Sequence, residues 1–506
     1  MKKWFAILLS AALLLSLSGC SGESPPDFSS SASSADVSQE EMPPSQPQPF
    51  TLAFYPEFSL HPALAGSRAN LTLAPLLYES LFTVDSSFQA QPLLCRSFAV
   101  SEDKLVWTFT LRSGITFSDG APLTGQVVAD ALNLARASGS RYQERLVDIT
   151  SITVLEEAPD QVVVTLSRPN GSLPLLLDIP IALGRSDRPA GTGPYVLSED
   201  ELSLTARSGW WQADKTLPTA SISLLAVSRS DDLIYGFDSG DISLVDVDLT
   251  ATNAAGYGGN YQTWDYPTTD FLYLGLNANK GVFRSADVRR AVCLAVNRDA
   301  IATTIYSNHA IATLCPVHPA SKLYQPGETP LTYNPEELAA QVERLRLKDC
   351  KLVFLVNSEN VAKAAAAQRI AYHLEAAGFA VELKQLPFED YTAALAWGEF
   401  DLYLGETVLT ADFDLSPLLS SAGTLNYGGW TAEGADALLA ALQGAGEDKA
   451  ACAAELFALL DEQAPIVPIL FKSCSVLTQW GQLSGLSPVR GNAFYQIENW
   501  NLEAAP

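Results

Sequence analysis

Three residues whose side chains bind metals lie close together in this sequence. His309, Cys315 and His318 share one short stretch, and imidazole and thiolate groups are common zinc ligands. A compact structural zinc site needs four ligands, and only three are local. The alternative is that all three are ordinary loop residues. We therefore expect no bound metal. If a metal were bound, these three residues would be its candidate ligands.

The common catalytic motifs are missing. The sequence has no G-x-S-x-G, H-E-x-x-H or G-x-x-x-x-G-K stretch and no paired C-x-x-C, and its four histidines offer little general-base capacity. The Gly-rich stretch from Gly191 to Tyr195 is not followed by a helix pattern with G-x-G-x-x-G spacing, so it predicts a turn before a strand, not a phosphate cradle. We expect no cofactor and no enzymatic activity.

Cys20 has a different chemistry. Lys2 and Lys3 precede an apolar run that is shorter than the roughly 20 residues a membrane-spanning helix needs. The run ends in Leu-Ser-Gly-Cys, which resembles the bacterial lipobox, where the cysteine thiol takes a lipid. We predict a lipoprotein signal over residues 1–20 and a membrane anchor at Cys20. A plain signal peptide and an N-terminal transmembrane helix are the alternatives.

Composition divides the rest of the chain. Residues 21–49 are rich in Ser and Pro and almost without apolar residues, which predicts a disordered tether. From Phe50 onward the sequence is that of a globular protein, long enough for two or three lobes. The net charge of −26 argues against nucleic acid as a partner, and we expect a monomer.

Six cysteines remain after Cys20. An extracytoplasmic location permits disulfides, but in a chain of this size six cysteines are not a disulfide framework. Cys293 and Cys452 lie in helical apolar runs, where a small buried thiol is expected.

Hydrophobic periodicity predicts mixed α/β structure. Residues 106–117 alternate on both sides of Arg112-Ser-Gly and predict a hairpin, and residues 151–168 predict a second one. Further on, KLVFLVNS, an Ala-rich helix ending at Gly378 and AVELKQLP predict a β-α-β unit. FDLYLGET predicts a further buried strand.

Six stretches resemble one family in their order along the chain. They are LLYESLFTVDSSFQAQPLLCRSFAVSEDKLVWTFTLRSGITFSDGAPLT, GTGPYVL, FDSGDISLV, FLYLGLNANKGVFRSADVRRAVCLAVNRDAI, ADFDLSPLL and APIVPILF. The chain resembles extracellular solute-binding proteins of the peptide/nickel class, family 5, which serve oligopeptide and dipeptide ABC importers.

The resemblance implies a periplasmic-binding-protein-like α/β fold with mixed sheets, in which two lobes joined by hinge strands close on a ligand. It also implies an extra N-terminal subdomain and a C-terminal tail that returns to the first lobe. We place these parts as follows: lobe I at 50–75, 185–270 and 475–506, the extra subdomain of lobe I at 76–184, and lobe II at 271–474.

The same resemblance implies the ligand contacts. Asp412 would pair with a peptide's α-ammonium, Asp414 is close enough to do so instead, and a solvated loop Asp is the alternative. Leu409 stands where relatives often carry a Trp. Phe388 falls at an aromatic position of the family, with a core role as the alternative. Lys472 would serve a ligand carboxylate, with an exposed surface lysine as the alternative.

Three hypotheses for function follow. The first is a lipid-anchored receptor that captures a peptide and delivers it to the permease subunits of an ABC importer. The second is the same fold binding another solute, such as a nickel chelate or a sugar. The third is a secreted enzyme with an unfamiliar site, against which the missing motifs argue.

Overall fold

The structure is a computed structural model, and it describes residues 49–252, 256–327, 330–446 and 448–502. The predicted signal, Cys20 and all but the last residue of the predicted tether lie outside these residues. No helix among the described residues is long and apolar enough to cross a membrane.

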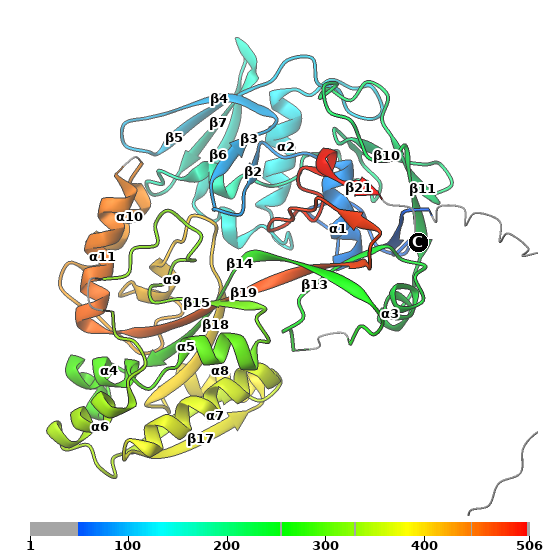
Figure 1. The fold of residues 1–506 in the computed structure, drawn as a ribbon. Helices are drawn as coiled ribbons and strands as arrows, with labels where there is room; N and C mark the ends of the chain where they lie inside the picture. Colours follow the sequence, from blue (N-terminus) through cyan, green and yellow to red (C-terminus); the bar gives the residue numbers. More distant parts are fainter. Residues whose placement is uncertain (1–48, 253–255, 328–329, 447, 503–506) are drawn as a thin grey trace, which may run out of the picture. The chain divides into compact units, whose positions relative to one another are not determined.

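One large mixed sheet runs through the molecule (Figure 1). Two long strands at its centre, β14 (Tyr261–Leu276) and β19 (Ile466–Gln479), pair antiparallel along most of their length. The pairing is irregular between Pro267 and Phe271, so the sheet changes register near the middle of both strands. The boundaries predicted after residues 270 and 474 fall inside these two strands. We call the part of the sheet on one side lobe I and the part on the other side lobe II.

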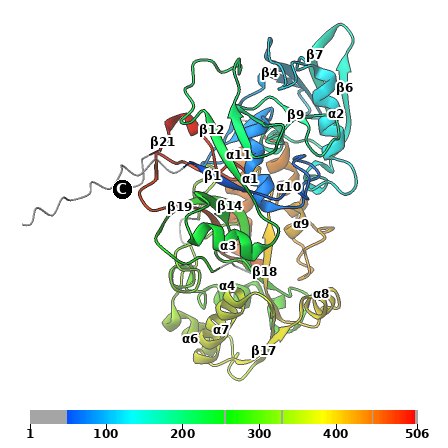
Figure 2. The ribbon, with the colours of Figure 1, turned by 90° about the vertical axis from the view of Figure 1, so that its right-hand side faces the viewer.

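As far as the structure describes it, the lobe I part of the large sheet contains five strands and two α-helices besides the shared strands. They are β1 (Thr51–Phe54), β10 (Tyr195–Leu197), β11 (Ser203–Ala206), β12 (Ser221–Ala226), β13 (Leu244–Val247), α1 (Arg68–Leu77) and α3 (Ser230–Asp238). Strand β1 is parallel to both β12 and β13, and α1 and α3 gather beside it (Figure 2). Leu52 and Phe54 pack in one core cluster with α1, whereas Ala53 packs in another with Phe237 of α3. The period-two alternation of β1 therefore places the two helices on opposite faces of the sheet.

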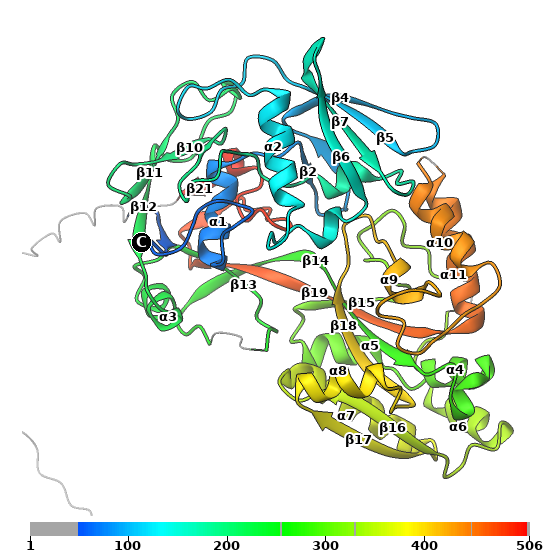
Figure 3. The same cartoon turned by 180° about the vertical axis from the view of Figure 1, so that it is seen from behind.

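Within the described residues, lobe II contains four further strands and eight α-helices. They are β15 (Ala310–Ala312), β16 (Lys351–Asn357), β17 (Ala380–Leu386), β18 (Leu402–Val408), α4 (Ala286–Cys293), α5 (Arg298–Ala300), α6 (Pro335–Arg344), α7 (Val361–Ala376), α8 (Phe388–Ala396), α9 (Ser416–Leu419), α10 (Ala435–Gly444) and α11 (Lys449–Gln463). The predicted β-α-β unit is confirmed as β16, α7 and β17, with Gly378 in the left-handed region at φ 109°. Helix α7 covers the face of this unit seen in Figure 1, and α8 covers the face seen in Figure 3.

A separate antiparallel sheet lies within the predicted extra subdomain. Its order is β4-β5-β7-β6, and it packs with α2; the bounds are β4 (Cys95–Val100), β5 (Val106–Leu111), β6 (Ile149–Leu155), β7 (Ala158–Leu166) and α2 (Gly125–Ala135). The hairpin of β6 and β7 is confirmed. The hairpin predicted for residues 106–117 is wrong, because β5 pairs with β4 and β7 and not with residues 115–117.

Three small two-stranded sheets complete the described residues. They are β2 (Phe82–Val84) with β3 (Ala90–Pro92), β8 (Ala182–Leu183) with β9 (Ala190–Gly191), and β20 (Leu483–Ser484) with β21 (Asn501–Leu502). Gly191 ends β9 and Tyr195 begins β10, and a bend at Gly193 and Pro194 lies between them, so the predicted turn before a strand is confirmed. A Cβ on Gly191 would stand 2.0 Å from the carbonyl oxygen of Leu77, so glycine allows close packing on the end of α1.

Candidate functional site

Each lobe has a point where its strand order reverses. In lobe I the chain continues from β1 to β12 on one side of it in the sheet and then to β13 on the other side. In lobe II it continues in the same way from β16 to β17 on one side and then to β18 on the other. Ligands of open α/β sheets bind outside the carboxyl ends of the strands at such switch points. The residues at these two places therefore form the candidate site.

The lobe I switch point is hollow. A pocket of about 250 Å³ opens between β1, β13 and the first turns of α1 and α3. Its lining is largely apolar and includes Leu52, Leu73 and Val245, while Arg68, Asp246 and Asp248 contribute charged groups. Arg68 donates a hydrogen bond to Asp246 over 3.1 Å, and the hydroxyl of Tyr266 donates to the same oxygen.

The lobe II switch point presents apolar side chains to solvent. Val361 begins α7, Phe388 begins α8, and Val408 ends β18. Their exposed fractions are 77%, 58% and 70%. The core role considered for Phe388 is therefore wrong. Three exposed apolar residues at the carboxyl ends of adjacent parallel strands form a surface that a ligand could cover.

Lys472 connects the two switch points. Its Nζ donates to Oδ2 of Asp248, directly after β13, over 2.7 Å and to Oε1 of Glu406 on β18 over 3.3 Å. Burial alone would lower the pKa of Lys472, but the carboxylates of Glu406 and Asp248 outweigh burial and raise it. The lysine is 3% exposed, so the surface position considered for it is wrong. Its charge is neutralised by the protein.

Asp270 lies next to this ion cluster. It sits in the irregular part of β14, and its backbone N–H donates to Oγ1 of Thr268. Burial raises the pKa of the Asp270 carboxyl to about 6; Lys472 opposes this rise, and the charges of Asp248 and Glu406 add to it. Asp270 is therefore a titratable group where the two lobes join.

Asp412 is buried and already has protein partners. Its Oδ2 accepts hydrogen bonds from Nδ2 of Asn170 over 3.0 Å and from Nε2 of Gln443 over 2.5 Å. Lys449 donates to the backbone oxygen of Asp412 and to Oγ of Ser172. The solvated position considered for Asp412 is wrong, because this residue is 1% exposed. Its other carboxylate oxygen, Oδ1, is buried and has no hydrogen-bond partner in the part of the chain that the structure describes.

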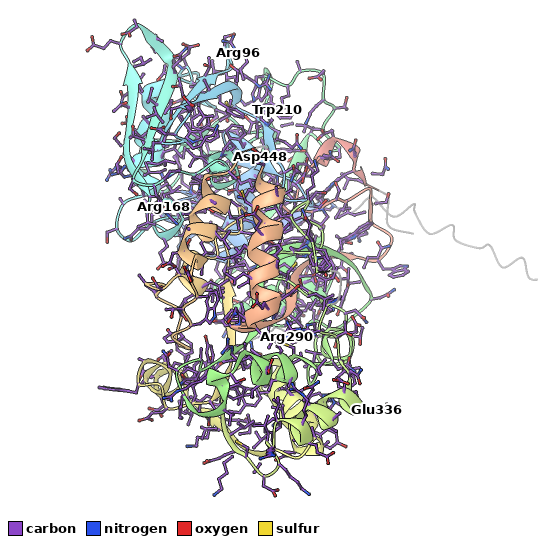
Figure 4. The ribbon with its side chains drawn as sticks, turned by 90° about the vertical axis from the view of Figure 1, so that its left-hand side faces the viewer. Arg96, Arg168, Trp210, Arg290, Glu336 and Asp448 are labelled. Atoms are coloured by element: carbon purple, nitrogen blue, oxygen red, sulfur yellow. The ribbon has the colours of Figure 1, made fainter. Side chains whose placement is uncertain are left out.

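Asp414 forms an ion pair with Arg168. Its Oδ2 accepts a hydrogen bond from Arg168 over 2.6 Å, and its Oδ1 accepts one from the backbone N–H of Ser416. Figure 4 shows Arg168 where the extra subdomain approaches α10 and α11. Leu409 is 6% exposed and packs in the core of lobe II. Asp412 and Leu409 are thus buried and Asp414 is partly buried, whereas Val361, Phe388 and Val408 are exposed.

The three candidate metal ligands do not converge. His309 faces the carboxylate of Asp265 at 3.1 Å, whereas His318 packs between the rings of Phe88 and Phe471. Burial lowers the pKa of His318 to about 4 and raises that of Cys315 to about 12. No group of three or more His, Cys, Asp or Glu side chains within the described ranges could hold a metal ion. The six cysteines after Cys20 are free thiols; Cys293 is buried as expected, and Cys452 is only partly buried.

Sequence reasoning did not find Asp248, Glu406 or the pocket. A signal for Asp248 was present, because an acidic residue directly after a buried strand is placed at the carboxyl edge of a sheet. Glu406 has the same signal, since it lies near the end of a buried strand.

Comparison with known proteins identifies the family. Residues 89–427, about two thirds of the chain, match the description "Bacterial extracellular solute-binding proteins, family 5 Middle". This chain belongs to that family of solute-binding proteins, and its predicted two-lobed α/β fold is confirmed.

Two solved structures are similar over nearly the whole fold. One is the unliganded open form of MppA, a periplasmic murein tripeptide binding protein, with a TM-score of 0.76, 19% identity and coverage of 90% of this chain and 98% of that one. The other is NikA from Brucella suis in complex with Fe(III)-EDTA, with a TM-score of 0.70, 17% identity and coverage of 90% and 100%.

Curated relatives match over a shorter region. The glutathione-binding protein GsiB of Salmonella paratyphi A is 26% identical over 302 residues, which cover 55% of this chain and 57% of GsiB. The chain thus spans little more than half the length of the curated relatives it matches. These relatives are binding proteins and not enzymes, in line with the absence of catalytic motifs.

Proposed function

We propose that this protein captures a peptide between its two lobes and delivers it to the permease subunits of an ABC importer. The observation that carries the proposal is the ion cluster at Lys472. One buried ammonium binds a carboxylate from the switch point of each lobe, Asp248 from lobe I and Glu406 from lobe II. A ligand held at both switch points would lie beside this cluster and be enclosed when the lobes close.

The surfaces at the two switch points favour a peptide over a sugar. A pocket lined mostly by apolar groups and three exposed apolar residues suit amino-acid side chains, whereas sugar hydroxyls need many polar partners. Two relatives bind peptides according to their descriptions, glutathione for GsiB and a murein tripeptide for MppA. NikA, described with Fe(III)-EDTA, keeps a metal chelate as the second candidate ligand.

Asp412 is the proposed partner of the peptide's α-ammonium. Its Oδ1 is a buried carboxylate oxygen that lacks a donor among the described residues, and such an oxygen favours an incoming N–H group. The amide groups of Asn170 and Gln443 hold the other oxygen in place. Phe388 would contact a ligand side chain from the lobe II surface. Lys472 would support the site by holding Asp248 and Glu406 together. It would not bind a carboxylate of the ligand.

Location follows from the proposed anchor. A lipid on Cys20 would hold the folded body outside the cell near its permease, at the end of the tether. The Cys20→Ser variant tests this, because it should be released from membranes or stay unprocessed. A processed variant that still partitions with lipid would refute the anchor.

The decisive experiment identifies the ligand first. Native mass spectrometry of the protein as purified should show a bound peptide, and calorimetry with that peptide should show one site. X-ray scattering should then show a smaller radius of gyration when the site is saturated. Titration with a nickel chelate and with sugars provides the comparison. Tight binding of either one without peptide binding, or peptide binding without compaction, would refute peptide capture by closure.

A further inference from the structure

The pocket at the lobe I switch point has a chemical preference that the proposed function does not state. We infer that it is a specificity pocket for one bulky, uncharged apolar side chain of the ligand, with Ala69 and Leu233 setting its size. This inference rests on the proposed capture of a peptide and concerns which peptides are bound.

The lining supplies the first argument. The floor consists of side chains from β1, α1 and β13 that also belong to the cores of lobe I, among them Leu52, Leu73 and Val245. These three are buried, so the floor is fixed by core packing. Ala69 on α1 and Leu233 on α3 are only partly buried and face the pocket from its two helices. A rigid apolar floor of this kind favours an apolar group over water.

The volume supplies the second argument. An apolar cavity of about 150 Å³ is large enough to bind benzene, so a pocket of about 250 Å³ can hold an aromatic ring or a branched aliphatic chain. A side chain as small as that of alanine would leave most of this volume unfilled and lose the corresponding contacts.

The charges at the pocket exclude a charged occupant. Asp246 is paired with Arg68, and Asp248 is paired with Lys472 and accepts two further hydrogen bonds from Thr250. Each acid that lines the pocket thus already has a cation from the protein. A lysine or glutamate side chain in the pocket would be desolvated without an opposite charge left to pair with it.

The test uses calorimetry with trialanine and the three tripeptides in which one alanine is replaced by phenylalanine. One of the phenylalanine peptides should bind the natural protein about 10–100-fold more tightly than trialanine, the gain typical of filling an apolar pocket. In the Ala69→Phe variant the new ring fills the pocket, so the variant should bind all four peptides with affinities within about twofold of one another. Ala340→Phe, the same change at an exposed position of α6, should keep the preference.

A second variant covers the case in which Ala69→Phe does not fold. Leu233→Ala enlarges the pocket. A further tripeptide, with tryptophan in place of the preferred phenylalanine, should bind this variant more tightly than the phenylalanine tripeptide does. Equal binding of all four peptides by the natural protein would overturn the pocket assignment while leaving peptide capture intact. An unchanged preference for the same phenylalanine tripeptide in both pocket variants would also overturn the pocket assignment. Failure of every peptide to bind, with another solute bound tightly, would overturn the proposed function and the inference together.

Discussion

The two switch points have the same topology and opposite surfaces. In each lobe one strand, β1 in lobe I and β16 in lobe II, lies between two parallel neighbours, and the helices α1 and α3, or α7 and α8, pack on opposite faces of the sheet. Lobe I leaves a pocket at this point, whereas lobe II exposes Val361, Phe388 and Val408. The topology therefore places the proposed ligand site, and the side chains at the ends of these strands and helices decide whether each switch point is a pocket or an exposed apolar surface.

The two switch points share their charged groups but not their apolar surfaces. Both lobes contribute a carboxylate to Lys472, so the cluster joins the switch points while each keeps its own surface. A buried ion cluster of this kind is weak evidence for stability as a whole, because desolvation offsets the attraction. Removing a single member is a different matter, since the remaining charges stay buried without a partner.

The largest effect is expected for Lys472→Met. The change leaves Asp248 and Glu406 without their shared cation, and the free energy of unfolding should fall by about 3–5 kcal/mol. Urea denaturation followed by circular dichroism measures it. Lys384→Met removes a half-exposed lysine that pairs with Glu382 at 3.5 Å, and it should cost less than about 1 kcal/mol. Equal effects of the two changes would mean that the cluster does not join the lobes.

Asp412→Asn tests the other buried carboxylate. Loss of the charge should weaken peptide binding by about 2–5 kcal/mol, the usual effect of breaking a buried charge pair. Calorimetry with free and N-acetylated forms of the peptide identified by mass spectrometry gives the measurement. The natural protein should bind the acetylated form poorly, and the variant should distinguish the two forms far less. Asp436→Asn, at an exposed carboxylate bonded to Ser421, is the control. Normal peptide binding by the Asp412 variant would exclude amine capture there.

The sequence predicted local structure well and distant partners poorly. The unit from β16 to β17 follows from the hydrophobic period and from Gly378, both of which lie within the unit itself. The wrong hairpin after β5 arose because turn residues do not reveal that β4 and β7 occupy both edges of that strand. Lys472 is separated from Asp248 by 224 positions and from Glu406 by 66, so no local pattern relates them. For the same reason the three exposed apolar residues could not be grouped before the strand order was known.

Asp270 makes the junction sensitive to pH. Its pKa is about 6 in the folded protein and lies near 3.8 for an ordinary aspartate, so folding favours its protonated form. Its charge therefore destabilises the folded protein fully above pH 6, and this cost is lost as the pH falls from about 6 toward 4. Asp270→Asn should raise the free energy of unfolding at pH 7 by about 2–3 kcal/mol, in proportion to the shift.

The measurement compares urea unfolding of the variant and the natural protein between pH 4 and pH 8. The difference should be small at pH 4 and reach its full value near pH 7. The groups whose charges act on Asp270 are Lys472, Asp248, Glu406 and Arg490, and a gain that did not change with pH would assign the effect to packing instead.

The smallest effect is expected at the exposed surface of lobe II. Val408 is 70% exposed, so Val408→Ser should change the free energy of unfolding by less than about 0.5 kcal/mol. If closure covers this side chain with the ligand, the same change should weaken peptide binding by about 1 kcal/mol, part of the value of fully burying a valine. Val147→Ser, at a residue 75% exposed in the extra subdomain, is the matched control and should alter neither quantity. Calorimetry resolves an affinity change of this size. Unchanged binding in the Val408 variant would mean that the ligand does not contact Val408, and the two switch points would then differ in role as well as in surface.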